Sequence, residues 1–573
     1  MKTSGAFTFV LHSHLPYARQ AGTWPHGEEW LYEAIAETYI PLLTALYDLR
    51  DESVPFHLTI GITPILVEQL ADPLIIDHFV SYAAERAAWA GKDVSRFEDA
   101  GDQALCENAR FYHHWYARNL TSFQDRFNRD IPGAFRLLQD EGFIEIATSA
   151  ATHGYLPLLS RDSSIYGQLQ TGVDTYRRHF GRDPKAIWMP ECAYRGAIED
   201  RQDGATIRRP GLESFLAGLG MRIFFSETHT VEGGKPVGKA AGEAIGPYGV
   251  SAGTPAPRLH TEMQTHPGTT FQPYWVGDEP GRVAVLGRNN ETGEQVWSGT
   301  HGYPGDFVYR EFHRKDSVSG MQYWRIGGKS LDLGSKPPYE PAKAADQVKA
   351  HAQHFASLVA RLLSEYEQES GRAGVISAAY DTELFGHWWF EGVDWLKEVL
   401  RLLAADQTIE LSTASRIVDE FTPPGVLDLP ESSWGEGGGH DTWLNDETRW
   451  MWPKIHAAER RIEDIVARNS NADPTNALLG QLARELLLLE SSDWPFLVTT
   501  GQAKEYATKR FNDHLRRFEQ LAELAERGND LVEAERARLA ELQEKDNPFA
   551  TIDFRVFAER QGSAAPIARA RVN

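Results

Sequence analysis

The sequence predicts an α/β fold in which parallel strands alternate with helices, and three observations support this prediction. Short apolar runs recur along the chain, segments with helical periodicity separate them, and polar or acidic residues follow each run directly. Apolar runs of about four to eight residues between helical segments are typical of parallel strands in repeated βα units. Polar groups at the carboxyl ends of several strands favour a barrel, whose βα loops build the active site. An open doubly wound sheet shares these local signals.

Five apolar runs carry the strand prediction. In chain order, AFTFVL precedes His12 and His14, GFIEIAT precedes His153, AIWMP precedes Glu191, RIFFSE ends in Glu227 before His229, and GVISAAY precedes Asp381. Because parallel strands end at the same edge of a barrel, these side chains are expected to gather there.

Helices are expected between the strands. Over residues 31–49 apolar side chains recur at helical spacing, and Pro41 is expected to kink this helix. The stretch GVDWLKEVLRLLA after Trp389 predicts another helix, with Gly392 near its start.

Changes in composition divide the chain. Residues from about 71 to 125 are charged and helical in pattern, which predicts a helical insertion, and residues from about 230 to 283 are rich in Gly, Pro and Thr, which predicts a loop insertion. After FTPPGVLDLPESSWGEGGGH the pattern becomes helical throughout. We therefore expect a catalytic domain over residues 1–420 and a helical C-terminal domain over residues 421–573, ending in a frayed tail.

Charge and composition narrow the partners and the compartment. Lys and Arg total 58 against 81 Asp and Glu, so the net charge is -23. This argues against nucleic acid and anionic membranes, which reward a basic face, and is compatible with a neutral sugar. The two cysteines, Cys106 and Cys192, argue against a disulfide framework. Without a signal-peptide pattern or an apolar stretch of about 18 residues, we expect a cytoplasmic protein.

Several tryptophans lie in polar surroundings. The chain holds 16 Trp, 20 Tyr and 27 Phe, most of which must pack in the core. The stretch SSWGEGGGHDTWLN, however, places Trp434 and Trp443 among glycine and polar residues. Aromatic faces in polar loops are surfaces on which sugar rings stack.

Three carboxylates follow predicted strands. Glu191 could be a nucleophile or could simply bond its backbone or Arg195. Asp381 and Glu383 lie two residues apart, so one would point into the barrel mouth while the other orients the loop or caps the next helix. The residues alone do not choose between these two. Carboxylates from different strand ends around one cleft are what glycosidic bond chemistry requires, namely a proton donor and a nucleophile or activated water.

The histidines leave two alternatives open. His12 and His14 alternate along a strand and could hold one Zn²⁺, which with Asp381 or His387 would suggest a metal-dependent deacetylase or hydrolase. Alternatively, His12 hydrogen-bonds a sugar hydroxyl. His153 and His229 could bind substrate or satisfy loop carbonyls. None of the predicted strands leads into a G-x-S-x-G elbow, and no dinucleotide-binding or Walker-A pattern occurs.

Taken together, the ordered stretches HSHLPY, ATHGYLPLL, WMPECAYR, AYDTELFGHWW and SSWGEGGGH resemble the five motifs of glycoside hydrolase family 57. The stretches WPHGEEWLYEAIAETYIPLL and ELLLLESSDWPFLVTTGQAKEYA are similar to its 1,4-α-glucan (glycogen) branching members. The resemblance runs over about residues 7–547. It implies a (β/α)7 barrel, a distorted relative of the TIM barrel, with a helical insertion and an all-α C-terminal domain.

The resemblance also implies an activity. A retaining enzyme without metal or other cofactor would cleave an α-1,4-glucan and re-attach the chain through an α-1,6 linkage, via a covalent glycosyl-enzyme intermediate. A 4-α-glucanotransferase or an α-amylase-like hydrolase of the same family is the alternative. The expected partner is an α-glucan such as amylose, amylopectin or glycogen, bound by a monomer.

Roles follow by position. Glu191 matches the family's nucleophile and Asp381 its proton donor and general acid/base. The expected substrate-binding residues are His12, Trp24, His153, Arg288, Trp297, Gly305, Trp434, Trp443, Asp493 and Gln502. The last two should let the C-terminal domain complete the cleft.

One stretch departs from the family pattern. Residues 233–247, GGKPVGKAAGEAIGP, stand where branching members carry a mobile loop with a tyrosine near its tip, and Tyr248 comes only just after them. We expect this loop to shield the intermediate less well and to raise the ratio of hydrolysis to branching.

Overall fold

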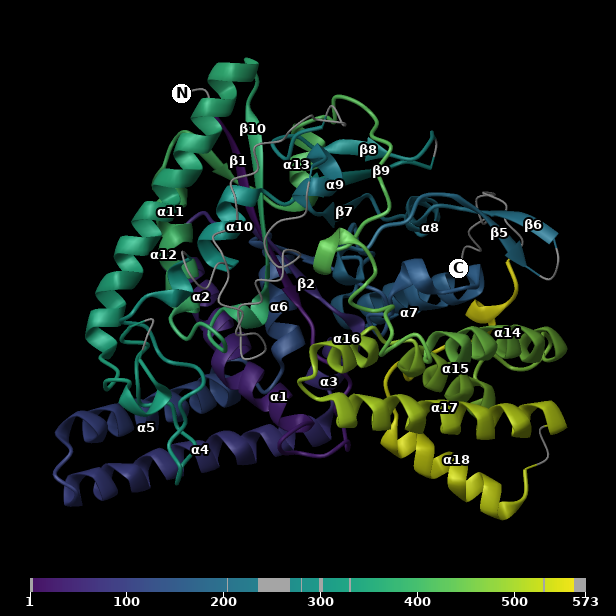
Figure 1. Cartoon of the computed structure of the whole chain (residues 1–573), viewed down its shortest axis with the longest axis horizontal. Helices are drawn as coiled ribbons and strands as arrows, with labels where there is room; N and C mark the ends of the chain where they lie inside the picture. The colour runs from purple at the N-terminus through teal and green to yellow at the C-terminus, as the bar shows by residue number, and fades with distance from the viewer. Residues whose placement is uncertain are drawn as a thin grey trace.

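The structure is a computed structural model of the 573-residue chain, and it describes residues 4–202, 205–234, 268–279, 281–297, 302–328, 331–528 and 531–560. Figure 1 shows strands at the centre, a long helical hairpin at the lower left, and the C-terminal helices at the lower right.

A ring of parallel strands forms the centre of the molecule. Two sheets contribute to it, with strand orders β10-β1-β2-β3 and β4-β7-β9. Single parallel bridges, Thr148↔Ile187 and Arg288↔Ser377, join the sheets at both ends. The seven strands are β1 (Gly5–Ser13), β2 (Leu58–Ile62), β3 (Ile144–Ala147), β4 (Ala186–Ile187), β7 (Ile223–Ser226), β9 (Val283–Gly287) and β10 (Gly374–Asp381). The predicted (β/α)7 barrel is confirmed, and all five predicted runs are strands in it.

The remaining strands lie outside the ring. β11 (Ile409–Leu411) pairs with the first residues of β1, whereas β2 pairs with its last residues. β8 (Tyr274–Val276) runs antiparallel to β9, and β5 (Ile198–Gln202) and β6 (Ala205–Arg209) form a separate hairpin.

Burial explains why the strand sequences are continuous apolar runs. Every residue of β1 is buried, and every residue of β10 except its last, Asp381. Strands of a parallel barrel are covered on both faces. Successive side chains are therefore all buried, and the strand sequence is a continuous apolar run without alternation. In β1 and β10 the titratable side chains, His12 and Asp381, come only where the strands reach the mouth of the barrel.

The helix expected over residues 31–49 has a π-helical turn in its middle. It consists of α1 (Glu28–Ala34), the π-helix η1 (Ile35–Tyr39) and α2 (Ile40–Asp51). Pro41 lies in the first turn of α2, where its missing N–H costs no hydrogen bond, and the Ile40 N–H bonds the Ile35 carbonyl across the wider turn. The irregularity expected at Pro41 is thus this π turn.

The charged segment near residues 71–125 forms the hairpin of α4 (Pro73–Asp99) and α5 (Gln103–Thr121) (Figure 1). Asp72 accepts hydrogen bonds from the Leu74 and Ile75 N–H groups, and Asp102 accepts one from Leu105. These caps fix where both helices begin. The segment is helical as expected, while the domain limits 1–420 and 421–573 stay predictions.

Further helices surround the barrel and form the C-terminal part. Around the barrel lie α3 (Pro64–Leu70), α6 (Ile131–Asp140), α7 (Asp162–Phe180), α8 (Leu212–Gly218), α9 (Thr228–Glu232), α10 (Asn290–Trp297), α11 (Pro341–Ser370), α12 (Gly392–Ala405) and α13 (Ala414–Glu420). The C-terminal helices are α14 (Trp452–Arg468), α15 (Ala477–Leu489), α16 (Asp493–Thr500), α17 (Lys504–Arg527) and α18 (Glu533–Lys545). The helix predicted from Gly392 is α12.

The loop expected over residues 230–283 is described only at its ends. Those ends contain α9, β8 and the start of β9. Residues 235–267, with most of the tyrosine-lacking stretch and Tyr248, lie outside the described residues.

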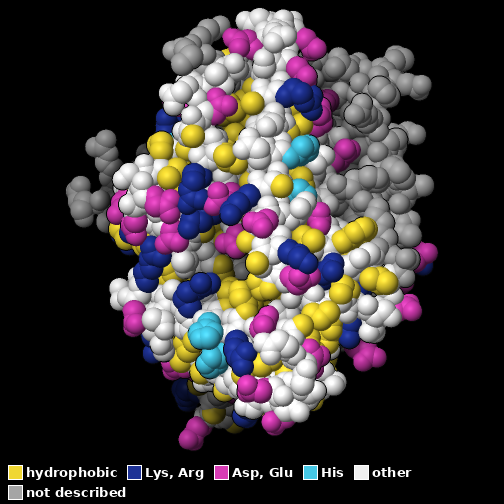
Figure 2. Space-filling view, turned by 90° about the vertical axis from the view of Figure 1, so that its left-hand side faces the viewer, with side chains coloured by type: hydrophobic (Ala, Val, Ile, Leu, Met, Phe, Trp, Pro, Cys, Tyr) yellow, Lys and Arg dark blue, Asp and Glu magenta, His cyan; other side chains and the backbone are white. Residues whose placement is uncertain are grey.

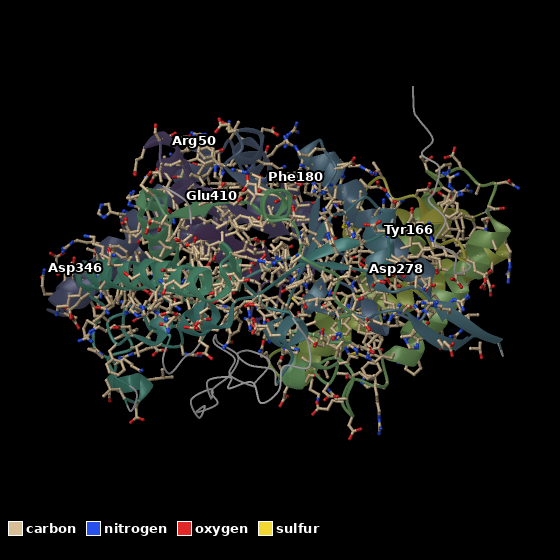
Figure 3. The ribbon with its side chains drawn as sticks, turned by 90° about the horizontal axis from the view of Figure 1, so that it is seen from above. Arg50, Tyr166, Phe180, Asp278, Asp346 and Glu410 are labelled. Atoms are coloured by element: carbon tan, nitrogen blue, oxygen red, sulfur yellow. The ribbon has the colours of Figure 1, made fainter. Side chains whose placement is uncertain are left out.

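From above, Tyr166 of α7 lies on the side where the C-terminal helices pack, and Arg50 and Asp346 lie on the opposite side (Figure 3). The face in Figure 2 carries acidic and basic side chains intermixed. Among the described residues, each helix is too short or too polar to span a membrane.

Candidate active site

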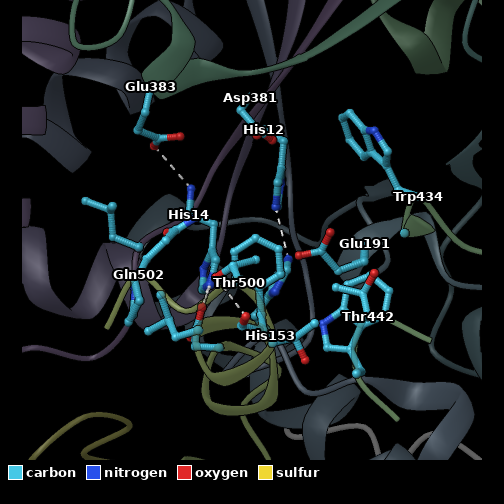
Figure 4. A pocket seen from close by; sticks show the side chains of 18 of the residues that line it. His12, His14, His153, Glu191, Asp381, Glu383, Trp434, Thr442, Thr500 and Gln502 are labelled. Atoms are coloured by element: carbon cyan, nitrogen blue, oxygen red, sulfur yellow. Dashed lines mark hydrogen bonds and ion pairs between the residues drawn. The ribbon is translucent and has the colours of Figure 1, made fainter. Parts of the chain in front are cut away.

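A pocket of about 380 Å³ opens at the carboxyl ends of the barrel strands. Both predicted catalytic carboxylates line it, with His12, His153, Trp434, Trp443, Asp493 and Gln502 from the predicted set (Figure 4). These residues come from β1 and β10, the segments that follow β3 and β4, the segment near residue 440, and the region of α16. The pocket therefore joins the barrel to the C-terminal helices.

Glu191 lies on a strained turn after β4. The turn Pro190–Cys192 places Glu191 at φ 59°, ψ 27°, in the left-handed region that residues with a side chain seldom adopt. The Trp434 N–H donates to the Glu191 carbonyl over 2.8 Å, and Ala193 N–H donates to Pro190 over 3.0 Å. Such a conformation costs about 1–3 kcal/mol and persists where its surroundings fix it, often at functional sites. Here it directs the carboxylate toward the His12–His153 pair (Figure 4).

Asp381 is the last residue of β10 and pairs in register with His12 of β1. The two residues therefore lie at the same level of the barrel mouth. Both carboxylates affect the pKa of the buried Cys192 thiol. Burial raises this pKa well above the usual value, and the charges of Glu227, Glu191 and Asp381 raise it further. Glu191 and Asp381, 190 residues apart in the chain, thus act on one small region.

Three imidazoles stack in the wall of the pocket. His12 Nε2 lies 3.1 Å from His153 Nε2, and the rings of His14 and His153 stack with centroids 3.9 Å apart. The other face of the His12 ring packs on Trp188, centroids 4.7 Å apart. Ser492 Oγ lies 2.8 Å from His153 Nδ1, so the C-terminal helices hold one end of the stack.

His14 has a protein partner on both ring nitrogens. Its Nδ1 lies 3.1 Å from Thr63 Oγ1 and its Nε2 lies 3.0 Å from Asp493 Oδ1. Burial lowers the pKa of His14, but the charge and hydrogen bond of Asp493, with the charge of Glu191, outweigh burial and raise it above its usual value. An imidazolium beside Glu191 is the favoured state at mildly acidic pH.

The metal hypothesis gains no support from this geometry. His12 and His14 direct their Nε2 atoms at different partners, His153 and Asp493. In the described part of the chain, the group whose ligand atoms lie close enough to share an ion is Glu485, His514 and Asp546, buried among the C-terminal helices. Arg517 pairs with Asp546 over 2.5 Å and Arg510 Nη2 lies 3.1 Å from His514 Nε2. A site working without metal stays a prediction.

Glu383 lies in the wall of the pocket. It is buried, and its Oε1 accepts hydrogen bonds from the His14 N–H over 3.2 Å and from the Tyr39 hydroxyl. Burial raises the pKa of Glu383 to about 8, with the Asp381 charge adding to the shift. The suggestion that it caps the next helix is wrong, because α12 begins at Gly392 and has no side-chain cap.

Four of the expected substrate-binding residues lie outside the pocket lining. Arg288 is buried and pairs with Glu227 over 2.9 Å, and its guanidinium lies 5.1 Å from the Trp434 ring centre. Trp297 packs edge-on against Trp434, 5.9 Å between centroids, so both residues pack around Trp434. Trp24 is 78% exposed, and Gly305 ends the turn Tyr303–Gly305. Their roles toward substrate stay predictions.

Sequence reasoning missed several lining residues. His14 entered only as a possible metal ligand, Glu383 only as the alternative to Asp381 or as a loop or capping residue, and Trp30 and Trp188 not at all. Trp188 lies inside the strand-end run AIWMP that precedes Glu191, which could have marked it. The other three depend on contacts between segments far apart in the chain.

Comparison with known proteins agrees with this arrangement. The model of glycosyl hydrolase family 57 matches residues 8–430. The chain belongs to glycosyl hydrolase family 57. A second model, described as 1,4-alpha-glucan branching enzyme, C-terminal, matches residues 454–557. Between them, the two matched segments of this family 57 chain supply both carboxylates and the α16 side of the pocket.

Named relatives and solved structures are similar to this family 57 chain over most of its length. It is 48% identical over 551 residues to a 1,4-alpha-glucan branching enzyme of Thermococcus kodakarensis, covering 96% of this chain and 78% of the relative. A crystal structure of a branching enzyme from that archaeon, in complex with glucose, has TM-score 0.87 and 46% identity and covers 97% of each chain. An alpha-amylase of Thermotoga maritima has TM-score 0.79 and 30% identity, covering 98% of this chain and 100% of that one.

Proposed function

We propose that the chain is a 1,4-α-glucan branching enzyme that cleaves an α-1,4 linkage and re-attaches the released chain through an α-1,6 linkage. The observation that carries the proposal is the pocket itself. Carboxylates from the ends of β4 and β10 line it, and residues of α16, within the segment matched by the branching-enzyme model, complete it. The relatives at 48% and 46% identity are named branching enzymes.

In the first half-reaction Glu191 is the nucleophile and Asp381 the acid. Glu191 attacks the anomeric carbon, the bond from that carbon to the departing oxygen breaks, and Asp381 gives its proton to that oxygen. In the second half-reaction Asp381 takes the proton of a glucan 6-hydroxyl, whose oxygen attacks the anomeric carbon and releases Glu191. The configuration is inverted twice and therefore retained.

The pocket's charges suit this sequence of steps. The His14 imidazolium, held by Asp493, favours an ionised Glu191, because an opposite charge nearby stabilises a carboxylate. The tryptophan faces of the lining offer surfaces for glucose rings, and in the proposal His12 and His153, which line the same pocket, contact the bound glucan. In the proposal Trp24, Arg288, Trp297 and Gly305 act on bound glucan from outside the described lining. The enzyme acts as a cytoplasmic monomer on amylose, amylopectin or glycogen.

Hydrolysis and 4-α-glucan transfer are the competing activities. The comparisons favour branching, since the alpha-amylase relative is 30% identical and the branching relatives are closer. The tyrosine-lacking stretch at residues 233–247 favours some hydrolysis beside branching. The test is incubation of the enzyme with amylose. New α-1,6 linkages are measured by enzymatic debranching and chain-length analysis, and their number is compared with the number of new reducing ends.

The expected result is new α-1,6 linkages in excess of new reducing ends. Reducing ends alone would identify a hydrolase, and redistributed chain lengths without branch points would identify a 4-α-glucanotransferase. A hydrolysis-to-branching ratio equal to that of tyrosine-bearing relatives would reject the effect assigned to the loop.

A further inference from the structure

The proposed mechanism gives no task to Glu383, although its carboxyl lies in the pocket two residues from Asp381. Its side chain is anchored through one oxygen. The His14 N–H and the Tyr39 hydroxyl both donate to Oε1. Figure 4 shows the His14 bond on one oxygen and the other oxygen turned toward the pocket. Oε2 is therefore the atom that a bound molecule meets.

The anchoring also determines where a proton would reside. An oxygen that accepts two hydrogen bonds has its lone pairs engaged, so the acid proton of a neutral Glu383 belongs on Oε2. Glu383 thereby differs from an ionised carboxylate, which only accepts hydrogen bonds. A protonated Oε2 donates one into the pocket.

The surroundings keep this acid neutral. The side chain is buried, and the groups that face it are the Asp381 carboxylate, the Tyr39 hydroxyl and His14. Burial and the charge of Asp381 oppose ionisation of Glu383. The hydrogen bonds from Tyr39 and from its own N–H, and the charge of His14, favour ionisation but offset burial only in part, so the pKa of Glu383 is raised to about 8. At neutral pH the proton is present.

We propose that Glu383 is a specificity-determining residue, which as a neutral acid donates a hydrogen bond from Oε2 to a hydroxyl of the glucan sugar beside Asp381. This inference rests on the proposed function. The group recognised is a sugar hydroxyl acting as acceptor, next to the glycosidic oxygen that Asp381 protonates. Ionisation above pH 8 removes the donor and places a second negative charge beside Asp381.

The test compares Glu383→Gln, Glu383→Leu and Glu391→Gln by kcat and KM for amylose between pH 6 and 9. Glu391 is the matched control, because it is another buried carboxyl whose pKa burial raises, to about 6, and it is absent from the pocket lining. Thermal unfolding of each variant checks that it is folded.

In the wild type, KM is expected to rise as the pH passes about 8. Glu383→Leu removes the donor and is expected to raise KM about tenfold at every pH, with a smaller change in kcat. Glu383→Gln keeps an N–H donor that cannot ionise, so it should recover most of that affinity and lose the alkaline rise in KM. Glu391→Gln should keep the wild-type pH profile.

Three outcomes would overturn the inference. An unchanged KM in a folded Glu383→Leu would show that the residue does not contact glucan. An alkaline rise that persists in Glu383→Gln would assign the titration to another group. Loss of kcat by orders of magnitude in Glu383→Gln would make Glu383 itself the acid/base. Failure of the proposed function gives a different result, because the wild-type protein would then form no α-1,6 linkages.

Discussion

The Nε2 atom of His14 lies 3.0 Å from Oδ1 of Asp493, so a hydrogen bond joins the end of the first barrel strand to a residue 479 positions later, at the start of α16. The His14 ring also hydrogen-bonds the Thr63 hydroxyl after β2 and stacks on the His153 ring after β3. Its backbone N–H donates a hydrogen bond to the Glu383 carboxyl after β10. Through its side chain and its backbone N–H, this one residue therefore links the ends of β2, β3 and β10 to the C-terminal helices. The pocket depends on both parts of the chain being docked.

Replacing Asp493 with Asn should destabilise the protein in a pH-dependent way. The raised pKa of His14 means that its pairing with Asp493 stabilises the fold fully below the pKa of His14 in the unfolded chain, about 6.5 for an ordinary histidine. This contribution is lost as the pH rises through the raised pKa of the folded state. Breaking a buried pair costs about 3–5 kcal/mol at most, and the remaining amide hydrogen bond reduces that figure.

Urea unfolding of wild type and Asp493→Asn from pH 5 to 9 measures the effect. The difference in unfolding free energy should be largest near pH 5 and shrink at alkaline pH. A difference independent of pH would mean that the ion pair contributes nothing beyond a neutral hydrogen bond.

Removing either catalytic carboxylate should abolish turnover without unfolding the protein. Glu191→Gln and Asp381→Asn are expected to lower kcat by at least about 10²–10⁴-fold, the range for loss of a positioned acid, base or nucleophile. In Asp381→Asn the second step slows, so a glycosyl adduct on Glu191 should accumulate with an activated donor such as a glycosyl fluoride. Mass spectrometry of the peptide containing Glu191 detects it. An adduct on another residue would reassign the nucleophile.

The sequence predicted those elements whose apolar pattern lies within their own residues. The five runs, the helix at 392–405 and the helical segment near 71–125 carry their periodicity in their own residues. LTIGI and VAVLG were not singled out as strands, because short apolar runs resemble segments of buried helices. His14 and Glu383 could not be assigned, because their roles depend on Asp493 and Tyr39 and on burial that only the folded chain provides. Choosing Asp381 over Glu383 required the family resemblance.

The buried pair of Arg288 and Glu227 offers a test of stability against binding. Arg288→Leu leaves the Glu227 carboxylate, 1% exposed, without the guanidinium 2.9 Å away. The expected cost is about 3–5 kcal/mol of unfolding free energy, and the double variant Arg288→Leu with Glu227→Gln should recover part of it. Denaturant unfolding measures both. If Arg288→Leu lost less than about 1 kcal/mol while KM rose, Arg288 would serve substrate instead of the fold.

The exposed Trp24 tests how far the glucan extends beyond the pocket. Because its side chain is 78% exposed, Trp24→Ala should change the unfolding free energy by less than about 0.5 kcal/mol. If a glucose ring stacks on it, as the family resemblance implies, KM for amylose should rise several-fold, whereas KM for a short maltooligosaccharide that fills only the pocket should stay constant. Trp450→Ala is a control, since this half-buried tryptophan packs on Phe511, away from the pocket lining. Equal changes in KM for long and short substrates would place Trp24 in the pocket region itself, and no change for either would remove it from the substrate path.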